Sequence, residues 1–439
     1  MDTLISNVTI VTMNENLDVI FGGHIGIQDG KIVHIGKKAP TEQPAEIIDG
    51  TGMVCMPGLV NCHTHLATSL LRSFSDELTL TEALELQLQK EAKMDSRCAK
   101  AAATVAAAEC LRFGVTSVSD LYYYPNATAE VIAESGMKAN LALSAYRFID
   151  ENEEFDFEQD EQCAELRRVV EKWHGYDNGR IKIDAGIWAE YTSNYPLWEA
   201  LSAYAGENGL GFQLHMSQSA QEDESCQDRT GLSQTELLSC HRVLTVPTTI
   251  AGCNVLSETD QKILGKHNAS AVVTPLSDAK QGRSCADILS CVKNGMNVAL
   301  GTDGAVEAGN LDMFEVMRFA AMAVRTAQGK ADALPAPAAL MMATVCGARA
   351  QGRAAECGML KVGMDADLCL VDFSAPHLMP CHNVPNALVF SAKGGDVAMT
   401  MVRGKKLYVN GQFPTLDLGG AVKELMEYAI PKLFDESEK

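Results

Sequence analysis

The stretch "PGLVNCHTHLATSLL", residues 57–71, places two histidines at the end of an apolar run. Side chains two apart on a strand point the same way, so His63 and His65 face together, and Asn61 shares their face. An HxH pair does not by itself define a metal site. Its meaning depends on which other side chains end on the same side of the fold.

Strands and helices alternate through the centre of the chain. The first strand is expected at residues 53–62, and helices such as 96–114 and 285–295 end at Gly114 and Gly295, in the manner of C-caps. Eight strands alternating with helices predict a parallel (β/α)8 TIM barrel. The seven further strands are expected at residues 115–122, 137–146, 180–189, 210–217, 247–253, 269–275 and 296–303.

Both ends of the chain are rich in short strands. "QDGK" (28–31) and "VNGQ" (409–412) carry Asp-Gly and Asn-Gly pairs, which favour hairpin turns. We therefore expect a small β-sandwich built from both termini. Its N-terminal part is residues 1–53, the barrel is 54–355, and residues 356–439 supply the C-terminal part and a final helix.

Composition limits the kinds of partner. A formal net charge of -21 over 439 residues repels nucleic acids and anionic membranes. The fourteen cysteines include no CxxC pair, which indicates free thiols in a reducing cytoplasm. The N-terminus lacks the features of a signal peptide, and no apolar run reaches about 18 residues. We expect a cytoplasmic protein with a small-molecule substrate and no nucleic-acid or membrane partner.

Two further candidate metal ligands end predicted strands. His215 in "GFQLHMSQ" (211–218) ends the fifth strand, and Asp303 in "VALGTDGA" (298–305) ends the eighth. Barrel enzymes keep their sites at these C-terminal strand ends. A single histidine such as His215 is more often a hydrogen-bonded core residue, but all four groups fall at strand ends. Three imidazoles and a carboxylate suit one divalent metal, Zn²⁺ first and Fe or Mn²⁺ next, and a metal-bound water can attack an electrophilic carbon.

Four segments resemble the amidohydrolase superfamily, in particular its branch of S-adenosylhomocysteine/methylthioadenosine deaminases and triazine hydrolases. The resemblance runs from about residue 3 to about residue 415. It implies a TIM barrel with a composite β-sandwich, a homo-oligomer, and one metal held by His63, His65, His215 and Asp303. The segments are residues 56–84, 301–321, 358–380 and 400–412.

The chain departs from this family around the expected catalytic pocket. The family's H-x-A-E-T is "HMSQS" here, so the proton-shuttling glutamate becomes Gln218, and Glu222 matches a later acidic position. A general acid/base typically supplies about 10²- to 10⁴-fold in rate, so this loss should be severe. The strand-six histidine becomes Gly252. Other differing positions are Trp188 after strand four, "VTP" (273–275) after strand seven, and Glu307, Ala308 and Gly309 in place of "SNN".

These observations leave two main hypotheses. In the first, the protein is a metal-dependent amidohydrolase that hydrolyses a C–N bond, deaminase-like or in a cyclic amide, of a small polar cyclic compound. Asp303 would then act as base, and Glu190, Glu222 or Glu307 would deliver the proton, although Glu307 is more readily interpreted as a solvated loop acid. In the second, the protein is a catalytically impaired relative that binds a metal or ligand. Triazine-type dehalogenation or C–N cleavage rests on family analogy alone. The changed positions also argue against ordinary adenosine-type deamination.

Overall fold

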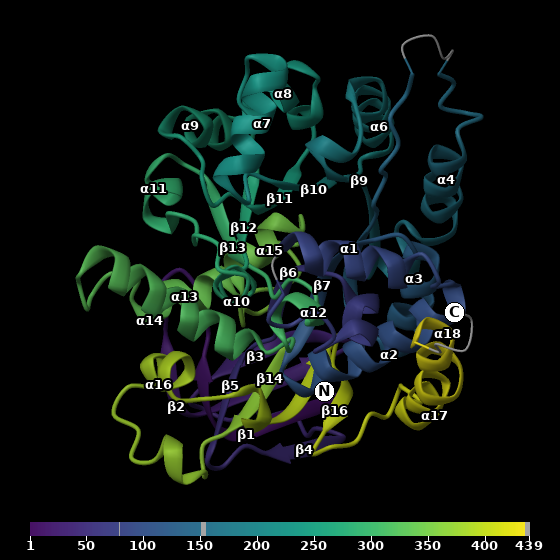
Figure 1. Cartoon of the computed structure of the whole chain (residues 1–439). Helices are drawn as coiled ribbons and strands as arrows, with labels where there is room; N and C mark the ends of the chain where they lie inside the picture. The colour runs from purple at the N-terminus through teal and green to yellow at the C-terminus, as the bar shows by residue number, and fades with distance from the viewer. Residues whose placement is uncertain (79, 151–154, 435–439) are drawn as a thin grey trace.

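A computed structural model describes residues 1–78, 80–150 and 155–434, and its centre is a parallel barrel (Figure 1). Eight strands pair in chain order, each parallel to the next, which confirms the predicted (β/α)8 architecture. They are β6 (Leu59–Thr64), β7 (Val115–Tyr122), β8 (Lys138–Leu143), β9 (Ile181–Ala189), β10 (Phe212–Met216), β11 (Thr248–Gly252), β12 (Ser270–Val273) and β13 (Asn297–Leu300).

Side chains and backbone close the barrel between its last and first strands. The Asn61 amide donates to Thr302 Oγ1 at 2.7 Å and accepts from the Thr302 backbone N–H at 3.0 Å. The Asp303 backbone N–H donates to the His63 carbonyl at 3.0 Å. Asn61 therefore shares the face of the two histidines, as expected, and joins strand ends that carry three of the predicted ligands.

The first strand was predicted as one unit over residues 53–62, and this prediction is wrong. The chain forms β5 (Met53–Pro57) in a different sheet and then β6 in the barrel. The Gly58 backbone N–H donates to the Asp367 carbonyl and the Leu59 N–H to the Gly114 carbonyl, so the hydrogen-bonding partner changes between these two residues. The apolar run is continuous because both sheets bury it; only Pro57, which has no N–H for a ladder, marks the change.

Helices surround the barrel. The helix predicted over 96–114 is α2, which ends where Gly114 adopts a φ of +81°. The helix predicted from 285 begins only at Ile288, because Asp287 caps it by accepting from the Ser290 N–H at 3.0 Å. The helices between barrel strands are α1 (Leu80–Glu91), α2 (Ser96–Arg112), α3 (Pro125–Ser135), α4 (Glu161–Trp173), α5 (Tyr176–Gly179), α6 (Tyr195–Asn208), α7 (Ala220–Thr230), α8 (Gln234–Cys240), α9 (Glu258–Lys266), α10 (Pro275–Lys280) and α11 (Ile288–Lys293).

In the described part of the chain, seven α-helices follow the last barrel strand. Among the described residues no helix is long and apolar enough to span a membrane. The predicted C-terminal helix forms two α-helices joined by a π-helical turn (Leu425–Ala429), and Ala429 and Leu433 of this segment are buried. The helices are α12 (Ala305–Ala308), α13 (Met313–Gln328), α14 (Ala336–Met342), α15 (Val345–Ala350), α16 (Val384–Phe390), α17 (Leu418–Glu424) and α18 (Ile430–Phe434).

The two ends of the chain form one mixed sheet, seen where purple and yellow strands lie side by side in Figure 1. Strands β5 and β14 join the ends as antiparallel neighbours, with Cys55 opposite Leu370. In the predicted "QDGK" hairpin, Gln28 pairs with Lys31. The composite unit predicted from both termini is therefore confirmed. Its strands besides β5 are β1 (Thr3–Val11), β2 (Val19–Gln28), β3 (Lys31–Gly36), β4 (Glu46–Asp49), β14 (Leu368–Asp372), β15 (Val397–Val402) and β16 (Lys405–Val409).

A buried ion cluster connects this sheet to the barrel. Lys138 begins β8 and its side chain is fully buried; its Nζ lies 2.6 Å from Asp365 Oδ2 and 2.7 Å from Asp367 Oδ2. These aspartates directly precede β14. The cluster lies at the N-terminal end of the barrel strands, the end that in barrel enzymes serves stability, and so away from the predicted site.

Candidate metal centre

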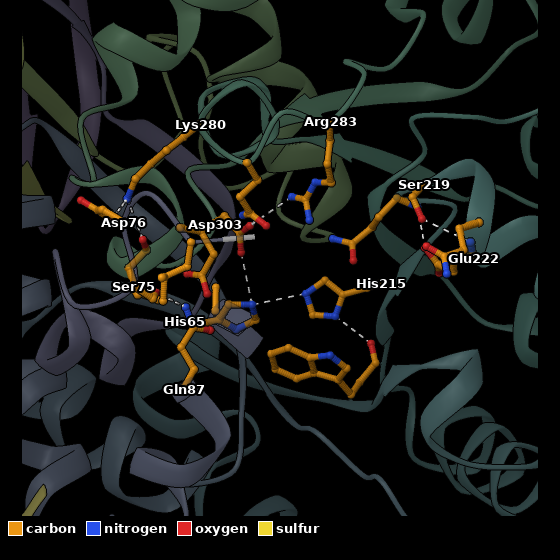
Figure 2. Close-up of a pocket in the computed structure, with 18 of the residues that line it drawn as sticks. His65, Ser75, Asp76, Gln87, His215, Ser219, Glu222, Lys280, Arg283 and Asp303 are labelled. Carbon is orange, nitrogen blue, oxygen red and sulfur yellow. Dashed lines mark hydrogen bonds and ion pairs between the residues drawn. The ribbon is translucent and has the colours of Figure 1, made fainter. Parts of the chain in front are cut away.

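The four predicted ligands meet at the C-terminal end of the barrel. Figure 2 shows how His65, His215 and Asp303 face one another. His63 and His65 come from β6, His215 from β10, and Asp303 from the segment after β13; all four are buried. His215 Nε2 lies 3.0 Å from His63 Nε2 and 3.3 Å from His65 Nε2. Asp303 Oδ1 lies 3.3 Å from His65 Nε2 and 3.5 Å from His63 Nε2. One donor atom from each residue therefore points to a common centre.

Backbone carbonyls orient two of the imidazoles. His65 Nδ1 donates to the Leu121 carbonyl at 2.6 Å, and His215 Nδ1 to the Trp188 carbonyl at 2.7 Å. A carbonyl only accepts, so both Nδ1 atoms carry hydrogen, and in the neutral rings the Nε2 lone pairs point inward. Lone pairs 3.3 Å apart repel unless a positive charge lies between them. This donor set fits a divalent cation. The Nδ1 atoms of His65 and His215 are hydrogen-bonded to carbonyls, as the non-coordinating nitrogens of metal-binding histidines typically are.

The protonation of these histidines is compatible with metal binding. Burial lowers the pKa of His63 and of His215, which favours the neutral rings that bind a cation. Burial also disfavours protonation of His65, but its hydrogen bond to Asp303 and the charge of that carboxylate outweigh burial and raise its pKa to about 9. A bound cation competes with that proton, so binding is expected to release it.

The Asp303 carboxylate is fixed from several sides. Its backbone has a φ of +66°, in the left-handed region that aspartate tolerates better than most residues. Oδ1 accepts from the Gly304 N–H at 3.0 Å, and Oδ2 accepts from the Ser277 hydroxyl at 2.6 Å. One oxygen thus faces the histidines while the other is held by Ser277 of α10.

A cavity of about 510 Å³ opens onto these ligands, which we call the central cavity. The half-buried Trp188 is part of its wall, and its ring stacks on His65 with centroids 5.0 Å apart. Trp188 was predicted as a pocket residue, and the structure places it there. The wall includes His65, Trp188, His215, Gln218, Glu222, Arg283, Asp303 and Glu307.

The two departures at positions 218 and 252 are physically linked. Gly252 has a φ of +103°, and a Cβ placed there would lie 2.7 Å from the Met216 carbonyl oxygen and 2.8 Å from Gln218 Cγ. The Gln218 side chain therefore occupies the space that a side chain at 252 would need. Neither residue supplies a group that can carry a proton at neutral pH.

Two of the three candidate proton donors are engaged elsewhere. Glu222 lines the central cavity, but its oxygens accept from the Gln218 backbone N–H at 2.8 Å and from Gln234 Nε2 at 3.0 Å. Glu190 is buried, and both of its oxygens bind Arg229, at 3.0 and 2.8 Å. Each carboxylate has a structural partner for each oxygen, so neither is free to face a substrate.

Glu307 differs from both. It lines the central cavity, and its Oε2 is buried without a hydrogen-bond partner in the described part of the chain. Its interpretation as a solvated loop acid is therefore wrong: α12 turns the side chain inward. Burial raises the pKa of Glu307 to about 8, with the negative charge of Asp303 acting in the same direction.

Arg283 was not predicted from the sequence. Its Nε donates to Asp278 Oδ1 at 3.1 Å and its Nη2 to Ser277 Oγ at 3.3 Å, while Nη2 lies 4.0 Å from Asp303 Oδ2. Figure 2 shows the guanidinium directed toward the metal ligands. The available signal was an arginine in "TPLSDAKQGR" (274–283), directly after the seventh strand.

Comparison with known proteins agrees with this geometry. Residues 54–407 match the amidohydrolase family model. A 5'-deoxyadenosine deaminase of Methanosarcina acetivorans is 35% identical over 424 residues, 96% of each chain. A 5-methylthioadenosine/S-adenosylhomocysteine deaminase of Thermoanaerobacter pseudethanolicus is 33% identical over 419 residues, 95% of this chain and 96% of the other. The structure of an adenosine deaminase from Xanthomonas campestris with bound zinc matches with a TM-score of 0.91 at 26% identity over 98% of both chains.

The chain belongs to the amidohydrolase family. Its relatives include deaminases of adenosine analogues, so the resemblance stated from the sequence is confirmed. The fold is also that of an atrazine chlorohydrolase from Arthrobacter aurescens TC1 complexed with zinc, with a TM-score of 0.89 at 21% identity over 97% of this chain and all of the other.

Proposed function

We propose that the protein is a metal-dependent hydrolase that cleaves a carbon–nitrogen bond of a small polar cyclic compound, in the manner of a deaminase. The convergence of His63, His65, His215 and Asp303 at the mouth of the central cavity carries this proposal. A cavity of about 510 Å³ has the size of typical small-molecule sites.

The chain's own residues supply parts of the chemistry. A divalent ion, Zn²⁺ being favoured by the three imidazoles, would lower the pKa of a bound water and make it a nucleophile. Asp303 would accept a proton from such a water. The Ser277 hydroxyl, 2.6 Å from Oδ2, keeps the carboxylate oriented while Oδ1 faces the reacting centre.

Arg283 points to the substrate class. Because Asp278 and Ser277 fix its guanidinium at the wall of the central cavity, it can donate to an oxygen on the substrate without losing much side-chain freedom. An amino-substituted ring that also carries an oxo or anionic group, such as an oxo-aminopurine or a pterin, therefore fits better than plain adenosine. The adenosine analogues named for the relatives belong in the same screen.

The test is ammonia release by the zinc-loaded protein from these rings and from a panel of cyclic amides checked for ring opening. We expect turnover of at least one compound, lost when His215 is changed to Ala. Zinc-loaded protein that turns over none of them would contradict the proposal.

That outcome would favour the second candidate, a catalytically impaired relative that binds a metal or a ligand. The observation behind it is the pair Gln218 and Gly252, neither of which can transfer a proton. A homo-oligomeric state and a cytoplasmic location also stay predictions, and light scattering of the purified protein tests the first.

A further inference from the structure

One carboxylate in the wall of the central cavity, that of Glu307, has a buried oxygen without a hydrogen-bond partner among the described residues. Of the described residues lining this cavity, Glu307 is the one with a buried carboxylate oxygen that accepts no hydrogen bond. Glu222 satisfies Gln218 and Gln234. A buried polar atom without a partner is costly, so its persistence calls for a use.

The local backbone makes room for this carboxylate beside the metal ligands. A Cβ at Gly304 would lie 2.2 Å from Glu307 Oε2 and 2.3 Å from Thr68 Oγ1. Gly304 directly follows the ligand Asp303, and Thr68 lies three residues after the ligand His65. The absence of a side chain at Gly304 thus lets the Glu307 carboxylate lie between the segments that follow β13 and β6.

This position is on a different side of the barrel mouth from Gln218. Gln218 follows β10 and covers Gly252 of β11, whereas Glu307 lies where the last barrel strand meets the first. A group at either place borders the same ligands. Among the described residues of the cavity wall, the carboxylate on the β10–β11 side, Glu222, is therefore engaged by Gln218 and Gln234, whereas Glu307 on the β13–β6 side has an uncommitted oxygen.

We propose that Glu307 is the catalytic acid that protonates the leaving nitrogen, and that the substrate's amino group consequently points toward the β13–β6 side of the cavity. This inference rests on the proposed function. The water oxygen forms a bond to the ring carbon, and one water proton passes to Asp303. The C–N bond breaks with its electron pair going to nitrogen, which takes the Glu307 proton and leaves as ammonia.

Proton balance then returns the site to its starting state. The water supplies two protons: one replaces the proton that Glu307 gave, and the other remains on the product, whose ring carbon now carries the oxo group. No oxidant or reductant is needed. A matched ring with chloride in place of the amino group requires no proton for departure, so its hydrolysis should not depend on Glu307.

This difference defines the experiment. Zinc-loaded wild type, Glu307→Gln and the control Glu190→Gln are compared on an amino-substituted ring and on its chloro analogue, with zinc content measured for each protein. Glu190→Gln also removes a buried carboxylate, but outside the cavity. We expect Glu307→Gln to lower ammonia release about 10²- to 10⁴-fold while retaining zinc and chloride release, and Glu190→Gln to keep both activities.

Gly304→Ala is the second variant, because its Cβ displaces the Glu307 carboxylate without removing it. It should also lose ammonia release more than chloride release. If wild type is active and Glu307→Gln is equally active, or loses both reactions in parallel, Glu307 is not the acid, although the proposed function stands. If zinc-loaded wild type releases neither ammonia nor chloride from any ring, the proposed function fails and this inference with it.

Discussion

Replacing Gly252 by histidine, the family's residue at this position, should destabilise this chain. Gly252 has a φ of +103°, where a side chain is strained, and the new Cβ would lie 2.7 Å from the Met216 carbonyl and 2.8 Å from Gln218 Cγ. The Met216 carbonyl oxygen cannot move without disturbing β10 and β11, whereas the Gln218 side chain can move away. A second substitution at Gln218 should therefore restore only part of the lost stability.

The expected magnitude follows from these contacts. Backbone strain of this kind costs about 1–3 kcal/mol, and overpacking costs about 1–3 kcal/mol. The sum of about 2–6 kcal/mol is a large part of a typical stability of about 5–15 kcal/mol. Adding Gln218→Ala, which removes Cγ, should return about 1 kcal/mol, a coupling of the size expected for touching residues.

Urea unfolding followed by circular dichroism measures this. With a slope of about 3 kcal/mol per molar, the midpoint for Gly252→His should fall by about 0.7–2 M. Gly209→His is the matched control, because Gly209 has a φ of +67° and nothing within 4 Å of a new Cβ. If Gly252→His is as stable as Gly209→His, the steric account of the two linked departures is refuted.

Three further predictions concern the ion cluster and the cavity. Lys138→Met removes the buried cation beside Asp367 and leaves Asp365 paired with Lys31 and Arg403 alone, so it should lower the free energy of unfolding by about 3–5 kcal/mol. Lys182→Met, at a partly exposed ion pair, should lower it by less than about 1 kcal/mol. Equal losses for the two variants in urea unfolding would contradict this prediction. Burial raises the pKa of Asp365, but Lys138, Lys31 and Arg403 outweigh it and lower that pKa to about 2. The ionised Asp365 carboxylate thus adds about 2 kcal/mol to the free energy of unfolding above about pH 4, and this contribution is lost as the pH falls toward 2. The free energy of unfolding of Asp365→Asn should therefore fall less steeply than that of the wild type between pH 4 and 2. Parallel curves of stability against pH for the two proteins would contradict this prediction. Arg283→Lys should raise KM about 10- to 100-fold for an oxo-bearing ring with kcat nearly unchanged, as expected for a lost charge-assisted hydrogen bond. An equal rise in KM for a ring without oxygen would exclude the role of Arg283 in binding a substrate oxygen.

The barrel and its ligands were predictable because local patterns encode them. The period-two spacing of His63 and His65 fixes their shared face, and His215 and Asp303 end apolar segments of strand length. The C-terminal ends of the strands in a parallel barrel meet at one mouth, so four ligands predicted separately from local sequence are expected to form one site.

The directions of side chains in the segments that follow the barrel strands were less predictable, because they depend on how each segment folds over the mouth of the barrel. The sequence alone indicates a solvated acid at Glu307, because a glycine three residues earlier does not reveal that the carboxylate folds back into the space at Gly304. Arg283 is oriented by Asp278 and Ser277, and no motif known for the family marked it. The sequence does not reveal the division between β5 and β6, because both sheets bury apolar residues.

The most direct test of the account is the metal content of protein purified without chelator from metal-supplemented cells, measured by mass spectrometry. We predict about one divalent ion per chain, most of it zinc, and none in His215→Ala. Protein that is empty as purified and stays empty after added zinc would contradict the central claim that His63, His65, His215 and Asp303 form a working metal site.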